Sequence, residues 1–417
     1  MTKLYRHLEA YEYIFAEGSA LGSMTVVNLA FLKGELDQHA LACAVERLQK
    51  QFQPLNVGIA KHAENWHFTQ SQQAVAISVE PAPDPSRLKS VAFQAMEEEC
   101  EARFDLTGPL WRIRVILGKD QHALFLSAHH SICDGISVQL LLDRLVAELN
   151  CPSEAQEQTP IPPSGSDCVA HQQTDLSQTP FTSGNEPEDM SAWVDTSQAM
   201  TLRNRTAWLD VEADKLKSLL QQCRQHGVTL NSLLFAVIAN ALATIAERPV
   251  SHVECSGNVN TRPYCQPEIA NEALGVFASS FSIDVACDGN PWQMAKRCGD
   301  DFATIIDSRV FLNTAKHQWY LNMADSHTPP PLGRYTCAHL SNLGRLAFSQ
   351  CDPVLPLHIT DSYFTSGQQQ SGSVFWVGAA TVGSRLNLVI NCVQPLVSER
   401  MRLAFIEQLR NGLLKLV

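Results

Sequence analysis

The chain has 417 residues, of which 45% are hydrophobic and 18% are charged, and its formal net charge is -12. This length exceeds one typical core and is enough for two ordinary domains, so we expect a globular protein. A nucleic-acid binder needs a basic stripe, which the sequence lacks, and the acidic balance argues against docking on an anionic membrane. The first residues do not resemble a signal peptide and no apolar run is long enough to span a bilayer, so we expect a cytoplasmic protein.

The 13 cysteines are scattered singly between Cys43 and Cys392, and no Cys-x-x-Cys pair occurs. This distribution disfavours zinc ribbons and thioredoxins, and it is typical of small buried side chains in a reducing compartment. No Gly-x-Gly-x-x-Gly follows a predicted strand and no Walker loop is present, so enzymes that use NAD or ATP are also disfavoured. We expect neither a bound cofactor nor a metal.

Strands and helices are both predicted within residues 1–150. The strands are predicted at 25–32, 74–80, 110–117 and 122–128, and the last two read as a β-hairpin. Helices are predicted to begin at Asp37, Pro85 and Gly135. The second hairpin strand leads directly into His129 and His130.

Residues 151–200 are rich in Pro, Ser, Thr, Gln and acidic residues, so they are predicted to form a linker or long surface crossover with little to bury. Residues 201–417 then resume the mixed pattern. Strands are predicted at 206–211, 251–259, 277–285, 335–341, 355–364, 374–382 and 385–393, and helices at 213–225, 229–245, 291–309, 311–323 and after Ser398. Because strands and helices do not alternate regularly, we predict an α+β fold with domains at 1–150 and 201–417, rather than a doubly wound sheet.

The segment from His129 to Gly135 reads His-His-Ser-Ile-Cys-Asp-Gly. Adjacent strand residues point to opposite faces, so one imidazole can face a cleft while the other faces the packed side. Asp134 can cap the following helix or pair with an arginine, and Gly135 permits a tight turn. Neutral imidazole suits the removal of a proton from a hydroxyl or amine that attacks a thioester. The segment therefore predicts acyl transfer, and no Gly-x-Ser-x-Gly elbow suggests a serine nucleophile.

Two other interpretations of this segment exist. The histidines could be a structural pair beside a helix cap. Alternatively, His129, His130, Cys133 and Asp134 could bind a metal, although neighbouring strand residues diverge and do not easily converge on one ion.

The pattern His-His-x-x-x-Asp-Gly resembles the signature of the superfamily that contains chloramphenicol acetyltransferase, nonribosomal peptide condensation domains and plant BAHD acyltransferases. The similarity is greatest to its polyketide-associated and stand-alone alcohol O-acyltransferases, and it covers nearly the whole chain. It implies a pseudo-dimer of two acetyltransferase-like subdomains, each a two-layer α+β sandwich, with a tunnel between them. It further implies that His130 is the general base, that His129 supports it, that Asp134 bonds an arginine, and that Gly135 keeps the tunnel open.

Arg262 ends a predicted strand and precedes Pro263, which is similar to the Arg-Pro segment of condensation domains. It could pair with Asp134 or shape the tunnel, or it could be a surface arginine before a turn proline. Arg112 and Arg114 are rival partners for Asp134.

Ser341 and Asn342 begin a Ser-Asn-Leu-Gly segment that follows a predicted strand. The segment resembles one in wax-ester and alcohol acyltransferases, and it stands where condensation and BAHD enzymes carry Asp-Phe-Gly-Trp. The two side chains could donate to the oxyanion or line the tunnel, or the segment could be a capped strand end with a turn glycine. Residues 365–373 read as a hairpin tip, whereas the resemblance suggests a loop that crosses between the subdomains.

The resulting prediction is an O-acyltransferase that moves an acyl group from a thioester to a hydroxyl of a secondary metabolite or lipid. The expected donor substrate is acyl-CoA or a phosphopantetheinyl acyl carrier protein, and the acceptor is a small-molecule alcohol. A stand-alone, amide-forming condensation enzyme is the alternative within the family. A non-catalytic carrier-docking module is the alternative from another class. Two internal subdomains suffice for a tunnel, so we expect a monomer.

Overall fold

The structure is a computed structural model that describes residues 3–154, 157–175, 178, 190–195, 201–270, 272–315, 333–370 and 372–417. The chain divides into two compact units. Unit 1 comprises Met1–Val169, Arg262–Phe277 and Arg345–Gly367, and unit 2 comprises Ala170–Thr261, Ala278–Gly344 and Gln368–Val417. Both units are discontinuous in sequence, whereas the domains predicted at 1–150 and 201–417 are contiguous.

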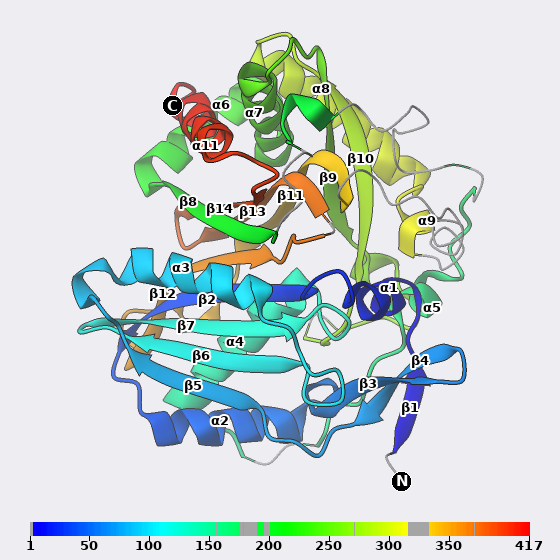
Figure 1. The fold of residues 1–417 in the computed structure, drawn as a ribbon, viewed down its shortest axis with the longest axis vertical. Coiled ribbons are helices and arrows are strands. Elements are labelled where there is room, and N and C mark those ends of the chain that lie inside the picture. Colours follow the sequence, from blue (N-terminus) through cyan, green and yellow to red (C-terminus); the bar gives the residue numbers. More distant parts are fainter. Residues whose placement is uncertain are drawn as a thin grey trace. The chain divides into compact units, whose positions relative to one another are not determined.

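Unit 1 is built on a five-stranded sheet with the strand order β12-β2-β7-β6-β5 (Figure 1). Strands β6 and β7 form the predicted antiparallel hairpin, and β5 runs parallel to β6. Helices α2 and α3 lie on opposite sides of this sheet (Figure 1), and α4 packs with α2. The bounds are β2 Thr25–Gly34, α2 Gln38–Gln51, β5 Ala76–Pro81, α3 Leu88–Glu101, β6 Trp111–Leu117, β7 Gln121–His129, α4 Gly135–Asn150 and β12 Leu357–Ser366.

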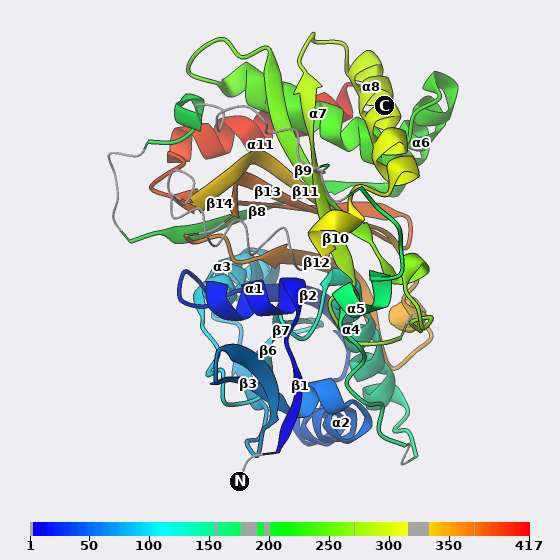
Figure 2. The ribbon, with the colours of Figure 1, turned by 90° about the vertical axis from the view of Figure 1, so that its right-hand side faces the viewer.

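The start of the chain adds helix α1 (Ala10–Gly18) and a three-stranded sheet of order β1-β4-β3 to unit 1. The strands are β1 (Leu4–His7), β3 (Val57–His62) and β4 (Asn65–Gln70). Figure 2 shows α1, in dark blue, at the upper end of β1. The sequence pattern predicts none of these four elements.

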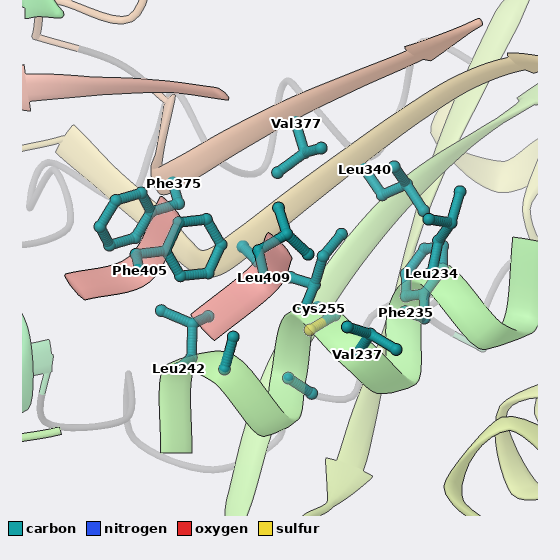
Figure 3. Packing of buried hydrophobic residues seen from close by; sticks show 14 of the residues in the cluster. Leu234, Phe235, Val237, Leu242, Cys255, Leu340, Phe375, Val377, Phe405 and Leu409 are labelled. Atoms are coloured by element: carbon teal, nitrogen blue, oxygen red, sulfur yellow. The ribbon is translucent and has the colours of Figure 1, made fainter. Parts of the chain in front are cut away.

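Unit 2 is built on a six-stranded sheet with the strand order β10-β9-β11-β13-β14-β8. Its helices and strands share one hydrophobic cluster, in which the rings of Phe375 and Phe405 stack with centroids 4.1 Å apart (Figure 3). The bounds are β8 Arg203–Val211, α6 Ala213–His226, α7 Leu230–Ile245, β9 His252–Asn260, β10 Ala278–Ala286, α8 Pro291–Ser308, β11 Arg334–Leu346, β13 Gly372–Val382, β14 Arg385–Gln394 and α11 Glu399–Leu414. The α+β class predicted from the sequence is confirmed.

Two predictions about the second half are wrong. Ser341 and Asn342 do not follow a strand, because β11 continues through them to Leu346. The segment 365–373 is not a hairpin tip, because β12 pairs with β2 in unit 1 whereas β13 pairs with β14 in unit 2. The chain therefore passes from one unit to the other between Gly367 and Gln368.

The segment 151–200 contains more buried side chains than its composition suggests. Short helices form at Gly165–Val169 and Met190–Ala192, and Cys168, Ala192 and Trp193 are buried. Of the helix predicted at 311–323, the structure gives α9 at Leu312–Ala315, and residues 316–323 lie outside the described part of the chain.

All 13 cysteines are free thiols, and nine of them are buried, as the scattered single cysteines of the sequence predict. In the described residues no single helix is long and apolar enough to cross a membrane. Helices α6 and α7 meet that test only as a pair, which is bent by 97°.

Candidate active site

Strand β7 delivers the two histidines from the centre of the sheet in unit 1. His129 is the last residue of β7 and pairs with Thr25 of β2. The next residue, His130, donates its backbone N–H to the carbonyl of Met24 at 2.8 Å, so the main chain stays fixed one residue beyond the strand. His129 is 1% exposed, whereas His130 is partly exposed. The alternation expected for adjacent strand residues therefore separates a fully buried histidine from a partly exposed one.

Asp134 ends the turn that follows the histidines, and it serves both roles that the sequence suggests. Its Oδ1 accepts the backbone N–H of Ser137 at 2.8 Å, which caps the N-terminus of α4. Its Oδ2 accepts Nη1 of Arg262 at 2.8 Å, and the two side chains are only 4% and 2% exposed. The Oδ2 atom also accepts the backbone N–H of Phe277 at 3.0 Å. Although burial acts in the opposite direction, these partners hold the pKa of Asp134 below its usual value.

The structure selects Arg262 among the three candidate partners of Asp134. Arg112 instead bonds Glu99 at 2.8 Å, and Arg114 bonds Glu80 at 2.7 Å. Arg262 is 3% exposed, so the interpretation as a surface arginine is wrong.

The segment that carries Arg262 also holds the motif through its backbone. The carbonyl of Gly275 accepts the backbone N–H of Asp134 at 2.9 Å and the hydroxyl of Ser137 at 3.0 Å. Nη2 of Arg262 donates to the Ser137 hydroxyl at 2.9 Å, and its guanidinium lies 4.8 Å from the centre of the Phe277 ring. Residues 262–277 thus fix the turn after His130, although they are distant from it in sequence.

The hydrogen bonds of His129 define its tautomer. Nδ1 faces the backbone N–H of Ser131 at 3.2 Å, and because that group can only donate, Nδ1 carries no proton. Nε2 lies 2.9 Å from the hydroxyl of Ser19, whose own proton goes to the carbonyl of Phe15 at 2.9 Å, so Nε2–H is the donor. Burial lowers the pKa of His129 to about 3, which keeps this ring neutral. Both ring nitrogens of His129 are therefore engaged in hydrogen bonds with other groups of the protein.

The His130 ring is arranged differently. It stacks on the ring of Phe15, with centroids 4.0 Å apart and an interplanar angle of 9°. Its Nδ1 has no hydrogen-bond partner within the described residues. Burial lowers the pKa of His130 below its usual value, and the charge of Asp134 partly opposes this effect. The ring is therefore neutral at pH 7 and can accept a proton.

The remaining predicted site residues lie in different places. Gly135 is the first residue of α4 and has no positive φ angle. Ser341 is 8% exposed in unit 2, and the neighbouring Asn342 donates its amide to Oδ1 of Asn231 at 3.0 Å. Oδ1 of Asn342 accepts the backbone N–H of Gly344, which has φ +68°. Gly135 belongs to unit 1, together with His130, Asp134 and Arg262, whereas Ser341 and Asn342 belong to unit 2.

Sequence reasoning missed the contribution of helix α1. Glu12 and Phe15 of α1 and its C-cap residue Ser19 each contact the histidine segment, and they stand at helical spacings of three and four residues. Glu9 and Glu12 form a capping box at the start of α1, but glutamate is not a preferred N-cap residue, so the sequence carries no clear local signal for this helix.

The described residues around the motif provide no set of donor atoms for the alternative of a metal centre. Among the described residues, no group of three or more histidine, cysteine or acidic side chains could hold an ion. Asp134 is engaged by Arg262, and the thiol of Cys133 points to the carbonyl of His129.

The condensation-domain family profile matches residues 13–306 of the chain. Cyclosporin synthetase from Tolypocladium inflatum is 24% identical over 284 residues, which is 62% of this chain and 2% of the synthetase. Tyrocidine synthase 3 from Brevibacillus parabrevis is 31% identical over 140 residues, which is 31% of this chain and 2% of that protein. The chain thus spans a small fraction of the curated relatives that it matches.

Solved structures resemble the whole chain. Polyketide synthase associated protein 5 from Mycobacterium tuberculosis matches with a TM-score of 0.71 and 17% identity, over 100% of this chain and 98% of that one. Trichothecene 15-O-acetyltransferase from Fusarium sporotrichioides matches with a TM-score of 0.73 and 11% identity, over 100% and 96%. The first condensation domain of the calcium-dependent antibiotic synthetase matches with a TM-score of 0.71 and 13% identity, over 99% and 96%. These likenesses confirm the predicted fold of two acetyltransferase-like subdomains.

Proposed function

This chain belongs to the condensation-domain family, and we propose that it transfers an acyl group from a thioester to a hydroxyl group of a small molecule. The observation that carries the proposal is the contrast between the two histidines. Both nitrogens of His129 are used by the protein, whereas His130 is neutral, partly exposed and fixed in its main chain. Only the second imidazole is available as a general base.

In the proposed reaction, neutral His130 takes the proton of the acceptor hydroxyl as its oxygen attacks the thioester carbon. The carbonyl π electrons move to oxygen and form a tetrahedral oxyanion. When the intermediate collapses, the C–S bond breaks and the thiolate leaves. The imidazolium then returns its proton to the sulfur, so the products are an ester and a free thiol. Asp134 touches no reacting atom in this scheme and keeps the turn in place with Arg262.

The donor in this proposal is acyl-CoA or an acyl group on a phosphopantetheinyl carrier protein, and no cofactor is bound. The acceptor is an alcohol of the secondary-metabolite or lipid class. The resemblance of Ser341 and Asn342 to the corresponding segment of alcohol acyltransferases supports the ester product. We also propose a cytoplasmic, monomeric protein, for which size-exclusion chromatography with light scattering is the direct test of the monomer.

A second candidate is amide formation, because three of the curated relatives are described as nonribosomal peptide synthetases. To separate the candidates, the purified protein is given an acyl pantetheine thioester with matched alcohol and amine acceptors, and the products are analysed by mass spectrometry. An ester supports the proposal, and an amide alone would replace it with the second candidate. A protein that binds an acyl carrier protein but never discharges its thioester would instead be a docking module.

The role of His130 is tested by His130→Ala, with His62→Ala as a control because His62 is an exposed histidine of the small sheet. We expect His130→Ala to abolish ester formation and thiol release while its circular dichroism spectrum stays native. We expect His62→Ala to keep full activity. Turnover near the wild-type rate in folded His130→Ala would reject the general-base assignment.

A further inference from the structure

One face of helix α1 contacts the histidine segment at three consecutive points. The carbonyl of Glu12 accepts the hydroxyl of Ser131 at 3.0 Å. The ring of Phe15 stacks on His130, and the hydroxyl of Ser19 meets Nε2 of His129 at 2.9 Å. Each of the first three residues of the motif is therefore contacted by α1 or by Ser19, its C-cap residue.

Helix α1 is itself anchored at its start. Both carboxylate oxygens of Glu12 accept Arg6 of strand β1 at 2.7 Å, and Glu12 is 3% exposed. Nε of Arg6 donates to the carbonyl of Pro162 at 2.8 Å. A bidentate pair of this kind fixes both position and direction, so α1 is a rigid support rather than a loose terminal helix.

The stacking on Phe15 is important because few other contacts fix the plane of the His130 ring. A histidine ring rotates about two side-chain bonds, and each nitrogen accepts a proton only within the ring plane. In many sites a hydrogen bond to the second nitrogen sets that plane. Here Nδ1 of His130 makes no hydrogen bond of normal geometry within the described residues, and the nearby backbone of His130 and Cys133 acts only to raise the pKa of the ring. One ring face, in contrast, lies parallel to Phe15 with the centroids 4.0 Å apart.

We propose that Phe15 is the positioning residue that orients the imidazole of His130. The aromatic contact keeps the ring plane, and therefore the lone pair of the base, aimed at the acceptor hydroxyl. It also favours the imidazolium formed when that proton arrives, because a cation over an aromatic face is stabilised. This inference rests on the proposed function for its catalytic meaning, but the orientation of the ring can be measured separately.

Phe15→Leu is the test variant, since leucine keeps an apolar side chain of moderate size but has no aromatic face. Phe15→Tyr is the rescue variant. Tyr11→Leu is the matched control, because it also replaces an aromatic residue of α1, and Tyr11 stacks on Phe15 with centroids 5.9 Å apart whereas the ring on His130 is that of Phe15. We expect kcat of Phe15→Leu to fall about tenfold, equivalent to about 1.4 kcal/mol, with KM little changed. We expect Phe15→Tyr and Tyr11→Leu to stay near the wild-type value.

The second readout is the NMR spectrum of the histidine ring protons, with His130 assigned by comparison with His130→Ala. Stacking on Phe15 places these protons in its ring current, so their signals are expected to be shifted upfield in the wild-type protein and to return towards the free-histidine position in Phe15→Leu. Unchanged His130 signals and unchanged kcat in Phe15→Leu would overturn the inference. If the wild-type protein acylated no acceptor, the proposed function would fail, while the NMR result would still decide whether Phe15 orients His130.

Discussion

The buried pair between Asp134 and Arg262 gives a prediction that can be worked through from its geometry. Each charge is almost completely removed from water, and Asp134 receives four donor contacts from Arg262, Ser137 and Phe277. Removing one partner strands the other charge, and such changes cost about 3–5 kcal/mol. We therefore expect Asp134→Asn and Arg262→Met each to destabilise unit 1 by about this amount, even though asparagine can still cap α4.

Removing both charges leaves neither stranded, so the double variant Asp134→Asn/Arg262→Met should lose about 2 kcal/mol less than the sum of the single losses. Urea denaturation followed by circular dichroism measures the four free energies of the cycle. Arg400→Met is the control, because Arg400 and its partner Glu247 are 80% and 58% exposed, and such pairs contribute about 0–1 kcal/mol.

The pH dependence of this cycle adds a second check. The pKa of Asp134 is lowered in the folded protein, so the pair stabilises above the pKa of an unfolded aspartate and loses its effect only as pH falls through the lower, folded value. The coupling free energy should therefore be the same at pH 5 and pH 8. Additive single-variant losses, within about 0.5 kcal/mol, would refute the reasoning that the two charges act as one unit.

Three further outcomes are expected. Because burial lowers the pKa of His130, kcat/KM should rise with pH through a midpoint below 6.5 and then stay level to pH 8, and a midpoint above 7 in a pH–rate profile would contradict a desolvated base. Because His129 has a folded pKa of about 3, the free energy of unfolding should fall by up to about 1.4 kcal/mol per pH unit as pH is lowered from 6.5 to 3. Urea denaturation at several pH values should show that the free energy of unfolding depends less steeply on pH in His129→Gln. In α11, Leu409→Ala should cost about 2–5 kcal/mol, whereas Leu403→Ala should cost less than about 0.5 kcal/mol, since Leu409 is 0% and Leu403 is 52% exposed; equal losses in thermal melts would contradict the observed helix face.

Features that depend on neighbouring residues could be predicted from the sequence. Asp37 and Ser398 begin helices α2 and α11 as expected, because each side chain accepts a backbone N–H within its own first turn. The hairpin of β6 and β7 was also predictable, because a short turn separates two apolar strands. The class of fold followed from these local elements.

Helix α1 could not be found in this way. Its buried positions are Ala10, Glu12 and Ala16, so the packed face carries small or charged residues and shows no strong apolar period. The burial of Glu12 depends on Arg6, which belongs to another element. Helix α1, which supports the candidate site, could therefore not be recognised from an apolar pattern, because a buried ion pair replaces apolar contacts on its packed face.

The other differences between the predictions and the structure arise from contacts between residues that are distant in the sequence. Arg262 lies 128 residues from Asp134, and apart from the family resemblance of its Arg-Pro segment, no local pattern distinguishes it from Arg112 or Arg114 as a partner. The Ser341-Asn342-Leu343-Gly344 segment reads as a turn, yet β11 continues through it, with Gly344 at positive φ inside the strand. Tertiary context thus overrides the usual preference of asparagine and glycine for turns.

Strand β12 has a consequence for biosynthesis. It pairs with β2 from Leu357 to Ser366, and β2 is an internal strand of its sheet only because of this late segment. While the ribosome is still translating the residues before Leu357, the outer edge of β2 carries backbone groups that have no strand partner, and such edges favour pairing with other chains. Unit 1 therefore reaches its final hydrogen bonding only after most of the polypeptide has been made, and fragments that stop near residue 150 should aggregate more readily than the full chain.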